Sequence, residues 1–192
     1  MRQPEPAAAG LLLAAGGGRR YGMPKALVRH RGQLFVERAA SMLHDAGCAP
    51  VIVVLGAAAD EVRSLATLPG SSLVDNPAWE DGMGSSVRAG LAALSTSDSA
   101  AVVVLPVDTP GVTAAAVRRL VALAGPDALA RASYDGVPGH PVLIGRAHWA
   151  GVADLATGDA GAREYLKRHN AIDVPCADLA SGVDVDRPED LP

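Results

Sequence analysis

A glycine-rich loop followed by basic residues is the stretch of this chain that is best suited to chemistry. An apolar run at residues 10–15 leads into three successive glycines, Gly16–Gly18, and then into Arg20 and Lys25. Glycines let several backbone amides turn toward one point and let phosphate oxygens approach closely. Arg20 can bind an outer phosphate through a fork of donors, and Lys25 can neutralise another as a point charge. The stretch predicts a cradle for a triphosphate.

The spacing within this loop excludes two familiar phosphate-binding motifs. There is no G-x-x-x-x-G-K-[ST], so the P-loop of many NTPases does not fit. The dinucleotide fingerprint G-x-G-x-x-G also fails, because its last position is Tyr21. On the loop alone, a purely structural turn is as good an interpretation as a nucleotide site.

A carboxylate follows a second apolar run. Residues 101–105 are strongly apolar and lead through Pro106 to Asp108 and Thr109-Pro110. In open α/β sheets, ligands bind at the carboxyl ends of the strands. A hard oxygen ligand there suits Mg²⁺, which bridges to substrate phosphates while keeping several waters. Asp108 is therefore a candidate metal ligand and catalytic residue, although a turn-forming Asp before Thr-Pro is the simpler alternative.

Apolar runs and helical patterns alternate along the chain. We predict strands at residues 10–15, 51–55, 72–74 and 101–105, and helices at 34–46, 58–65, 85–94 and 113–124. Continuous apolar strands separated by helices indicate a mostly parallel sheet covered on both faces, a doubly wound Rossmann-like α/β fold. Two further strands, at 128–134 and 141–144, are expected to be joined by a loop longer than a tight hairpin. Helices at 146–155 and 160–169 and a strand at 172–175 follow.

Composition limits the organisation and the partners of the chain. Its 192 residues fit one domain at 7–192 after a flexible segment at 1–6. The formal net charge of −4 provides no basic stripe for nucleic acid. The apolar run near the N-terminus is too short to span a bilayer, and the two distant cysteines fit free thiols in a reducing compartment. We expect a cytoplasmic protein with no nucleic-acid or membrane partner.

The motifs around these residues are similar to those of a known enzyme family. The pattern Leu13-Ala14-Ala15-Gly16, then Arg20, Gly22 and Pro24-Lys25, resembles the signature of molybdenum cofactor nucleotidyltransferases, the MobA-like or MocA-like NTP transferases. Tyr21 departs from the Met or Phe usual in that group, and a bulky ring can still pack under the loop. Three more segments match in the right order: 76–90, 105–110 and 183–191. The resemblance implies the fold of nucleotide-diphospho-sugar transferases.

The resemblance also assigns roles to residues. The nucleotide-binding set that it implies comprises Leu13, Ala14, Ala15, Gly16, Gly17, Gly18, Arg20, Lys25, Ser85 and Ser86. Arg20, Lys25 and Asp108 are the predicted catalytic residues. His140 and Arg163 lie in segments that match the acceptor side, which favours substrate binding over a general-base role for His140.

A second metal ligand is expected in the segment 183–191. If residues 184–186 form a strand, Asp184 and Asp186 share one face, so either carboxylate can serve. Comparison with related sugar and isoprenoid enzymes favours Asp184. Asp186 can instead cap the turn into Pro188. The expected metal is Mg²⁺, with Mn²⁺ as an alternative.

The function that this resemblance implies is transfer of CMP from CTP to molybdopterin, with release of pyrophosphate. In this family Leu-Ala-Ala-Gly goes with CTP and Leu-Ala-Gly-Gly with GTP, and the Ala15 methyl leaves less room for a purine. A GTP-dependent enzyme, or one acting on a sugar phosphate or another phosphorylated acceptor, is the first alternative. A non-catalytic carrier of the molybdenum cofactor is the second. A molybdoenzyme or its chaperone is a further partner compatible with the resemblance.

Overall fold

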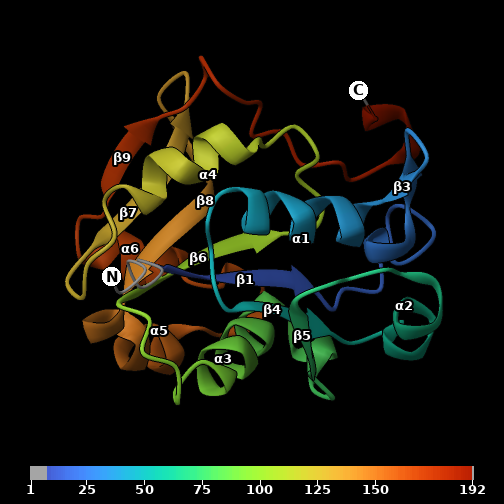
Figure 1. Cartoon of the computed structure of the whole chain (residues 1–192), viewed down its shortest axis with the longest axis horizontal. Coiled ribbons are helices and arrows are strands. Elements are labelled where there is room, and N and C mark those ends of the chain that lie inside the picture. Colours follow the sequence, from blue (N-terminus) through green and yellow to red (C-terminus); the bar gives the residue numbers. More distant parts are fainter. Residues whose placement is uncertain (1–7, 192) are drawn as a thin grey trace, which may run out of the picture.

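A seven-stranded sheet forms the centre of the computed structural model, which describes residues 8–191 (Figure 1). The strands lie in the order β5 (Ser71–Asp75), β4 (Val51–Leu55), β1 (Ala8–Ala14), β6 (Ala101–Pro106), β8 (Val137–Gly145), β7 (Leu129–Tyr134) and β9 (Ile172–Pro175). β5, β4, β1 and β6 pair in parallel, and β8 is antiparallel to both of its neighbours. The predicted mostly parallel α/β sheet is confirmed.

Helices cover both faces of the sheet. One face packs against α1 (Phe35–Asp45), α2 (Ala59–Leu65) and α4 (Ala114–Val121). The other face packs against α3 (Met83–Ala93), α5 (Trp149–Leu155) and α6 (Arg163–Arg168). β1 is wholly buried because both faces are covered, which explains its continuous apolar sequence. Side chains such as Leu11 and Leu12, on opposite faces of β1, each gain about 1.5–3 kcal/mol from burial.

The helices and strands predicted between residues 10 and 175 all exist, with bounds shifted by a few residues. The expected helices at 146–155 and 160–169 each begin with a 3₁₀ turn, Arg146–His148 and Gly158–Ala160, before α5 and α6. A small hairpin was not predicted: β2 (Arg29–His30) and β3 (Gln33–Leu34) pair across a two-residue turn. The predicted flexible segment at residues 1–6 lies outside the described residues. Between residues 8 and 191, no helix is both long and apolar enough to cross a membrane.

The prediction that a long loop joins the two strands after residue 128 was wrong. Tyr134 pairs with Val137, so Asp135 and Gly136 alone make the turn, and both have positive φ angles, 51° and 82°. Asp-Gly is a favoured pair for this tight hairpin turn. β8 therefore begins at Val137, four residues before the start of the strand predicted at 141–144. Val137 and Pro138 pair with β7 alone, whereas β6 pairs only from Val142 onward, so prolines cost few ladder bonds there.

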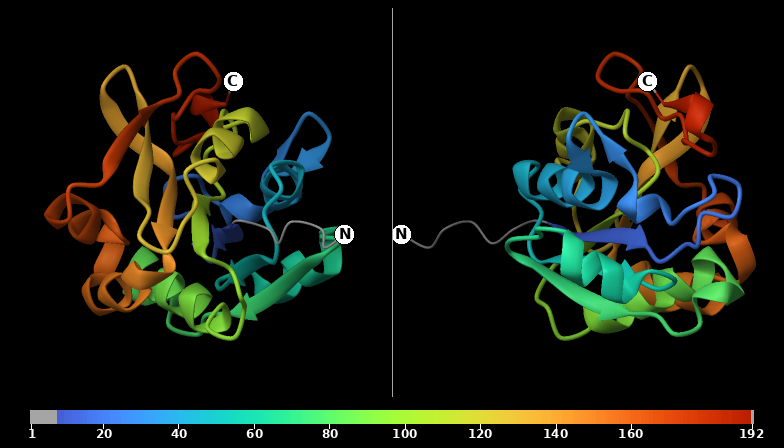
Figure 2. Two further views of the ribbon diagram at one scale, coloured as in Figure 1. Left: turned by 60° about the vertical axis from the view of Figure 1, so that its left-hand side comes forward. Right: turned by 90° about the vertical axis from the view of Figure 1, so that its right-hand side faces the viewer.

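The segment that we expected to be a strand around Asp184 is not one. Residues 180–187 form no strand or helix, and a 3₁₀ turn, Pro188–Asp190, follows. Val185 donates its amide to the carbonyl of Asp108 at 2.8 Å, and Ser181 donates to the carbonyl of Gly111 at 3.1 Å. The C-terminal segment is thus held by single hydrogen bonds to the loop after β6, and not by pairing with a strand. They return the C-terminal segment to the end of β6, where it passes beside the β7–β8 hairpin (Figure 2).

Candidate active site

A cavity of about 540 Å³ opens at the carboxyl ends of β1 and β6. This is the edge at which parallel α/β sheets bind ligands. The glycine loop, the loop before α3 and the C-terminal segment all contribute to its walls. Its lining residues are Leu13, Ala15, Gly16, Gly17, Gly18, Arg19, Arg20, Lys25, Trp79, Glu80, Gly82, Met83, Ser86, Pro106, Val107, Asp108, Asp159, Asp184 and Asp186. Segments separated by more than 160 residues in sequence therefore meet in one site.

The glycine loop folds back on itself immediately after β1. Gly22 donates its amide to the carbonyl of Gly18 at 2.9 Å, which closes the turn. Gly18 has a φ of 63°, and a Cβ built there would lie 1.8 Å from the carbonyl oxygen of Met23. A side chain at this position is therefore excluded both by conformation and by space. By contrast, a Cβ on Gly16 would meet no protein atom within 4 Å, so glycine there leaves open space beside the cavity.

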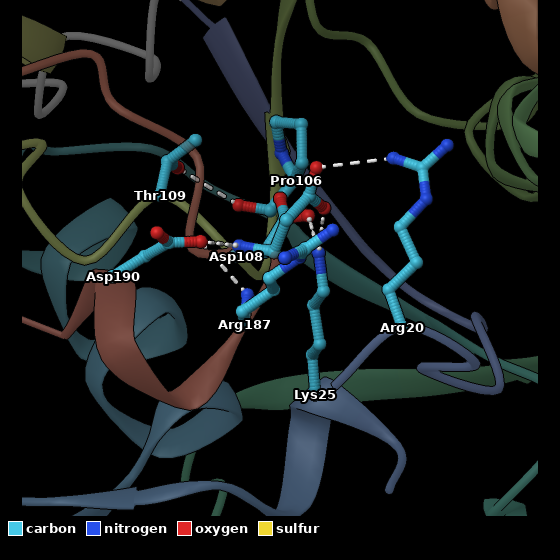
Figure 3. A network of polar contacts seen from close by, with 8 residues as sticks. Arg20, Lys25, Pro106, Asp108, Thr109, Arg187 and Asp190 are labelled. Carbon is cyan, nitrogen blue, oxygen red and sulfur yellow. Dashed lines mark hydrogen bonds and ion pairs between the residues drawn. The ribbon is translucent and has the colours of Figure 1, made fainter. Parts of the chain in front are cut away.

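Two cations of the loop are held by carboxylates from other parts of the chain. The Lys25 ammonium lies 2.8 Å from the carboxylate of Asp108 and 2.7 Å from that of Asp186. Arg20 reaches Asp186 at 3.2 Å. Figure 3 shows Lys25 and Arg20 approaching the carboxylates from different directions. The predicted catalytic residues Arg20, Lys25 and Asp108 thus share one charged cluster, joined by Asp186.

The pKa values in this cluster reflect its ion pairs. Burial lowers the pKa of Lys25, but its hydrogen bonds to Asp108 and Asp186 outweigh that effect and raise the pKa above its ordinary value. The hydrogen bond from Lys25 lowers the pKa of Asp186, and the charge of Arg20 contributes in the same direction. Both groups are therefore charged throughout the neutral pH range. The side chain of Lys25 is only 14% exposed, so solvent screens its charge less than it screens a surface charge.

Asp184, the favoured second metal ligand, lines the same cavity as Asp108. Burial raises the pKa of the Asp184 carboxyl to about 6, and the nearby negative charges of Asp108 and Asp186 add to the rise. Crowded carboxylates of this kind are suited to a divalent cation, whose charge would relieve their repulsion. Within residues 8–191, no three His, Cys, Asp or Glu side chains form a ready-made metal cage. A metal held here would therefore depend on one or two carboxylates together with substrate phosphates.

The C-terminal turn is capped by a residue other than the one considered from the sequence. The carboxylate of Asp190 accepts the amides of Asp186 and Arg187, at 3.2 and 2.8 Å. The hypothesis that Asp186 caps this turn was therefore wrong. Its side chain is instead engaged by Lys25 and Arg20. Asp186 had been kept as the alternative second metal ligand, but its pairing with Lys25 and Arg20 was not predicted.

The two predicted serines at the start of α3 lie in different surroundings. Ser86 lines the cavity, whereas the hydroxyl of Ser85 donates to the carbonyl of Gly82 at 2.8 Å, and Ser85 is not among the lining residues. Both side chains accept hydrogen bonds from the buried amide of Asn76, at 2.7 Å for Ser85 and 3.0 Å for Ser86. Asn76 was part of the motif in the sequence, but no role was predicted for it.

Other residues of the loop before α3 also reach the cavity. Trp79 lies against the glycine loop, since a Cβ built on Gly17 would be 3.2 Å from its ring. A Cβ on Gly56, after β4, would meet both the Ala15 carbonyl oxygen and the Trp79 Cβ at 2.6 Å. Glycine at this position therefore lets Trp79 approach the end of β1 closely. Trp79, Glu80 and Asp159 are lining residues that were not predicted for the site.

His140 and Arg163 do not line this cavity, although they influence its charges. Burial lowers the pKa of His140 to about 4, opposed by the negative charge of Asp108 and reinforced by the positive charge of Arg163. His140 is therefore neutral at physiological pH and only a weak base. The charge of Arg163 also lowers the pKa of Asp184, against the larger effects that raise it. Both residues thus lie near the carboxylates, beside the mapped cavity.

The geometry agrees with the family to which the chain is related. Residues 10–172 match the model of the MobA-like NTP transferase domain. The chain belongs to this family. It is thus a member of a nucleotidyltransferase family, and its glycine loop, Lys25 and Asp108 lie within the matched residues.

Individual relatives extend over almost the whole chain. "Nicotine blue oxidoreductase" of Paenarthrobacter nicotinovorans is 39% identical over 196 residues, covering 97% of this chain and 95% of that protein. Rv0371c of Mycobacterium tuberculosis superimposes with a TM-score of 0.82 at 27% identity, covering 96% of each chain. A structure of Rv0371c in complex with manganese gives a TM-score of 0.75 at 26% identity, covering 94% of this chain and 92% of that one. At 18% identity, a molybdopterin-guanine dinucleotide biosynthesis protein A from Archaeoglobus fulgidus shares the fold, with a TM-score of 0.66 and coverage of 95% and 94%.

Proposed function

We propose that the chain transfers a nucleoside monophosphate from a nucleoside triphosphate to a phosphorylated acceptor and releases pyrophosphate. The observation that supports this most strongly is the position of Lys25. Its ammonium lies between Asp108 and Asp186 at the end of the glycine loop, with Arg20 at the same carboxylate. A triphosphate in the loop would replace the carboxylates as the partner of these cations. Asp108 would then be available to a metal ion.

The residues of the cavity fit a divalent metal. Asp108 and Asp184 are the proposed ligands, and Mg²⁺ is the proposed ion, with Mn²⁺ as the alternative. The manganese complex of Rv0371c supports divalent metal binding within this fold. When bound, such an ion would offset negative charge on the phosphates. The protein's own contribution is to hold the two carboxylates at the end of β6.

The reaction requires alignment more than proton transfer. An oxygen of the acceptor phosphate would attack the α-phosphorus, the bond from that phosphorus to the bridging oxygen would break, and pyrophosphate would leave. A phosphate monoester is already largely ionised near pH 7, so a general base is unnecessary. Lys25, Arg20 and the Gly16–Gly18 amides would stabilise the charge that develops on the leaving pyrophosphate. The low pKa of His140 agrees with a hydrogen-bonding role toward the acceptor, together with Arg163.

CTP and molybdopterin are the substrates that we propose first. Ala15 lines the cavity and packs against Gly56 and the loop that carries Trp79, so its methyl group occupies space at the wall. A purine would require more room at this position than cytosine. The test is a competition between CTP and GTP, with Mg²⁺ and molybdopterin, followed by identification of the dinucleotide. Exclusive use of GTP would overturn the choice of base, and pyrophosphate release with only a sugar phosphate would overturn the choice of acceptor.

A second candidate function rests on the 39% identical relative, which is named an oxidoreductase. The cavity would then hold the pyrophosphate of a reduced nicotinamide dinucleotide, and a dye would accept the hydride. We propose to assay the purified chain in parallel for pyrophosphate release from CTP and for oxidation of the reduced dinucleotide with nicotine blue. Dye-dependent oxidation without pyrophosphate would favour the oxidoreductase. Tight binding of nucleotide without either reaction would favour a carrier.

A further inference from the structure

Asn76 holds a buried polar network whose hydrogen-bond directions can be traced atom by atom. Asn76 follows β5 and is 4% exposed, as are Ser85 and Ser86. Its side-chain oxygen accepts the amide of Ala78 at 3.1 Å. Because a backbone amide can only donate, this bond places the Asn76 oxygen toward Ala78 and its NH₂ group toward the serines. Both serine oxygens must then accept from Asn76.

The two serine protons consequently have different destinations. Ser85 donates its proton to the carbonyl of Gly82 at 2.8 Å. Ser86 has accepted a bond from Asn76, and the structure gives no acceptor for its proton among residues 8–191. Ser86 is also the serine that lines the cavity. Its hydroxyl is therefore left with a proton to donate toward whatever occupies the cavity.

We propose that Asn76 is a positioning residue that fixes the Ser86 hydroxyl as a hydrogen-bond donor to an acceptor atom of the bound nucleotide. The inference rests on the proposed function, because it takes the occupant to be a nucleoside triphosphate. It separates the two serines: Ser86 contacts the nucleotide, and Ser85 serves only the network at the start of α3. Asn76 itself touches no substrate and acts through Ser86.

The variant that isolates this effect is Asn76→Asp. A carboxylate can still accept the amide of Ala78, but it cannot donate to the serines. The Ser86 proton would turn toward the new carboxylate, and the hydroxyl would present only lone pairs to the nucleotide. We expect the dissociation constant of CTP, measured calorimetrically with Mg²⁺, to rise roughly tenfold. In the pyrophosphate assay KM for CTP should rise similarly, while kcat and KM for the acceptor change little.

A double-mutant cycle shows whether Asn76 acts through Ser86. Ser86→Ala should weaken CTP binding by a similar factor, and Asn76→Asp should add nothing in the Ser86→Ala background. Simple repulsion of the triphosphate by the new charge would instead add its full effect in both backgrounds, which would overturn the proposal. Ser85→Ala removes the hydroxyl of the same network that does not line the cavity, so it should weaken CTP binding clearly less than Ser86→Ala does.

Two further measurements keep the test decisive. In the free protein, the side-chain NH₂ protons of Asn76 should exchange slowly with solvent, and fast exchange would overturn the assigned orientation. If Asn76→Asp does not fold, equal effects of Ser85→Ala and Ser86→Ala on CTP binding would overturn the proposal. If the wild-type chain neither binds CTP or GTP nor releases pyrophosphate, the proposed function fails and the nucleotide contact of Ser86 fails with it. Wild-type binding with an additive cycle overturns the role of Asn76 alone.

Discussion

The two ends of the cavity are built from different kinds of polar groups. At the glycine-loop end, Lys25 and Arg20 are paired with the carboxylates of Asp108 and Asp186, and several of these side chains are partly exposed. At the α3 end, Asn76, Ser85 and Ser86 form a neutral, buried network. In our proposal, the charged end must exchange its partners to admit a triphosphate and a metal. The neutral end needs no such exchange, so it is prepared for its ligand in advance.

Removal of Lys25 should give the largest effect at the charged end. Lys25→Ala removes the ammonium that balances two carboxylates and, in our proposal, the leaving pyrophosphate. We expect turnover to fall about 100- to 1,000-fold, with little change in melting temperature. The matched control is Arg29→Ala, which removes an exposed cation of the same basic stretch that does not line the cavity. Normal turnover in Lys25→Ala would contradict the assignment of this residue.

Asp108→Asn tests whether the carboxylate at the end of β6 holds a metal. The amide keeps the size of the side chain and loses its charge, so Mn²⁺ should bind at least about tenfold more weakly, and turnover should fall about 100-fold. Binding is followed by the electron paramagnetic resonance signal of free Mn²⁺. Asp173→Asn, at a carboxylate paired with Arg131 on the far strands, is the control. Unchanged Mn²⁺ affinity in Asp108→Asn would exclude Asp108 as a ligand.

Arg20→Ala should have a smaller effect than Lys25→Ala, because the Arg20 side chain is 76% exposed and its charge is screened by solvent. We expect KM for the nucleoside triphosphate to rise about tenfold at low ionic strength. The difference from wild type should shrink as salt is added, since screening weakens exposed charge interactions. A salt-independent defect would indicate instead that Arg20 contributes to the shape of the loop.

His140 provides a pH test on the acceptor side. Its pKa is about 4 in the folded chain and about 6.5 in the unfolded chain. Below pH 6.5 the unfolded chain binds a proton that the folded chain excludes, so this contribution to stability is complete above about pH 6.5 and is lost as the pH falls toward 4. Nuclear magnetic resonance titration should find His140 neutral at pH 5. His140→Gln should reduce the loss of stability between pH 6.5 and 4, measured by chemical denaturation.

The sequence predicted the parts of the molecule that follow from local patterns. The parallel sheet followed from apolar runs separated by helices, and Lys25 and Asp108 followed from motifs at the ends of strands. The pairing of Lys25 with Asp186 could not be predicted, because the two residues are 161 positions apart and the C-terminal segment docks without a strand. The tight Asp135-Gly136 turn was missed because the second strand was predicted to begin only at residue 141, whereas β8 begins at Val137. The first residues of β8, Val137 and Pro138, pair with β7 alone, so the missing amide of Pro138 costs few ladder hydrogen bonds.

The docking of the C-terminal segment has a consequence for the order in which the site can be assembled. Residues 181–190 emerge from the ribosome after every strand of the sheet, yet they supply Asp184 and Asp186. Before this segment has been made, Asp108 is the one of the two carboxylate partners of Lys25 that the nascent chain can supply. The second side of the proposed metal and phosphate site is completed only when the amide of Val185 reaches the carbonyl of Asp108. Chains shortened before this segment lose both carboxylates together with the buried side chain of Val185, so we expect them to be inactive.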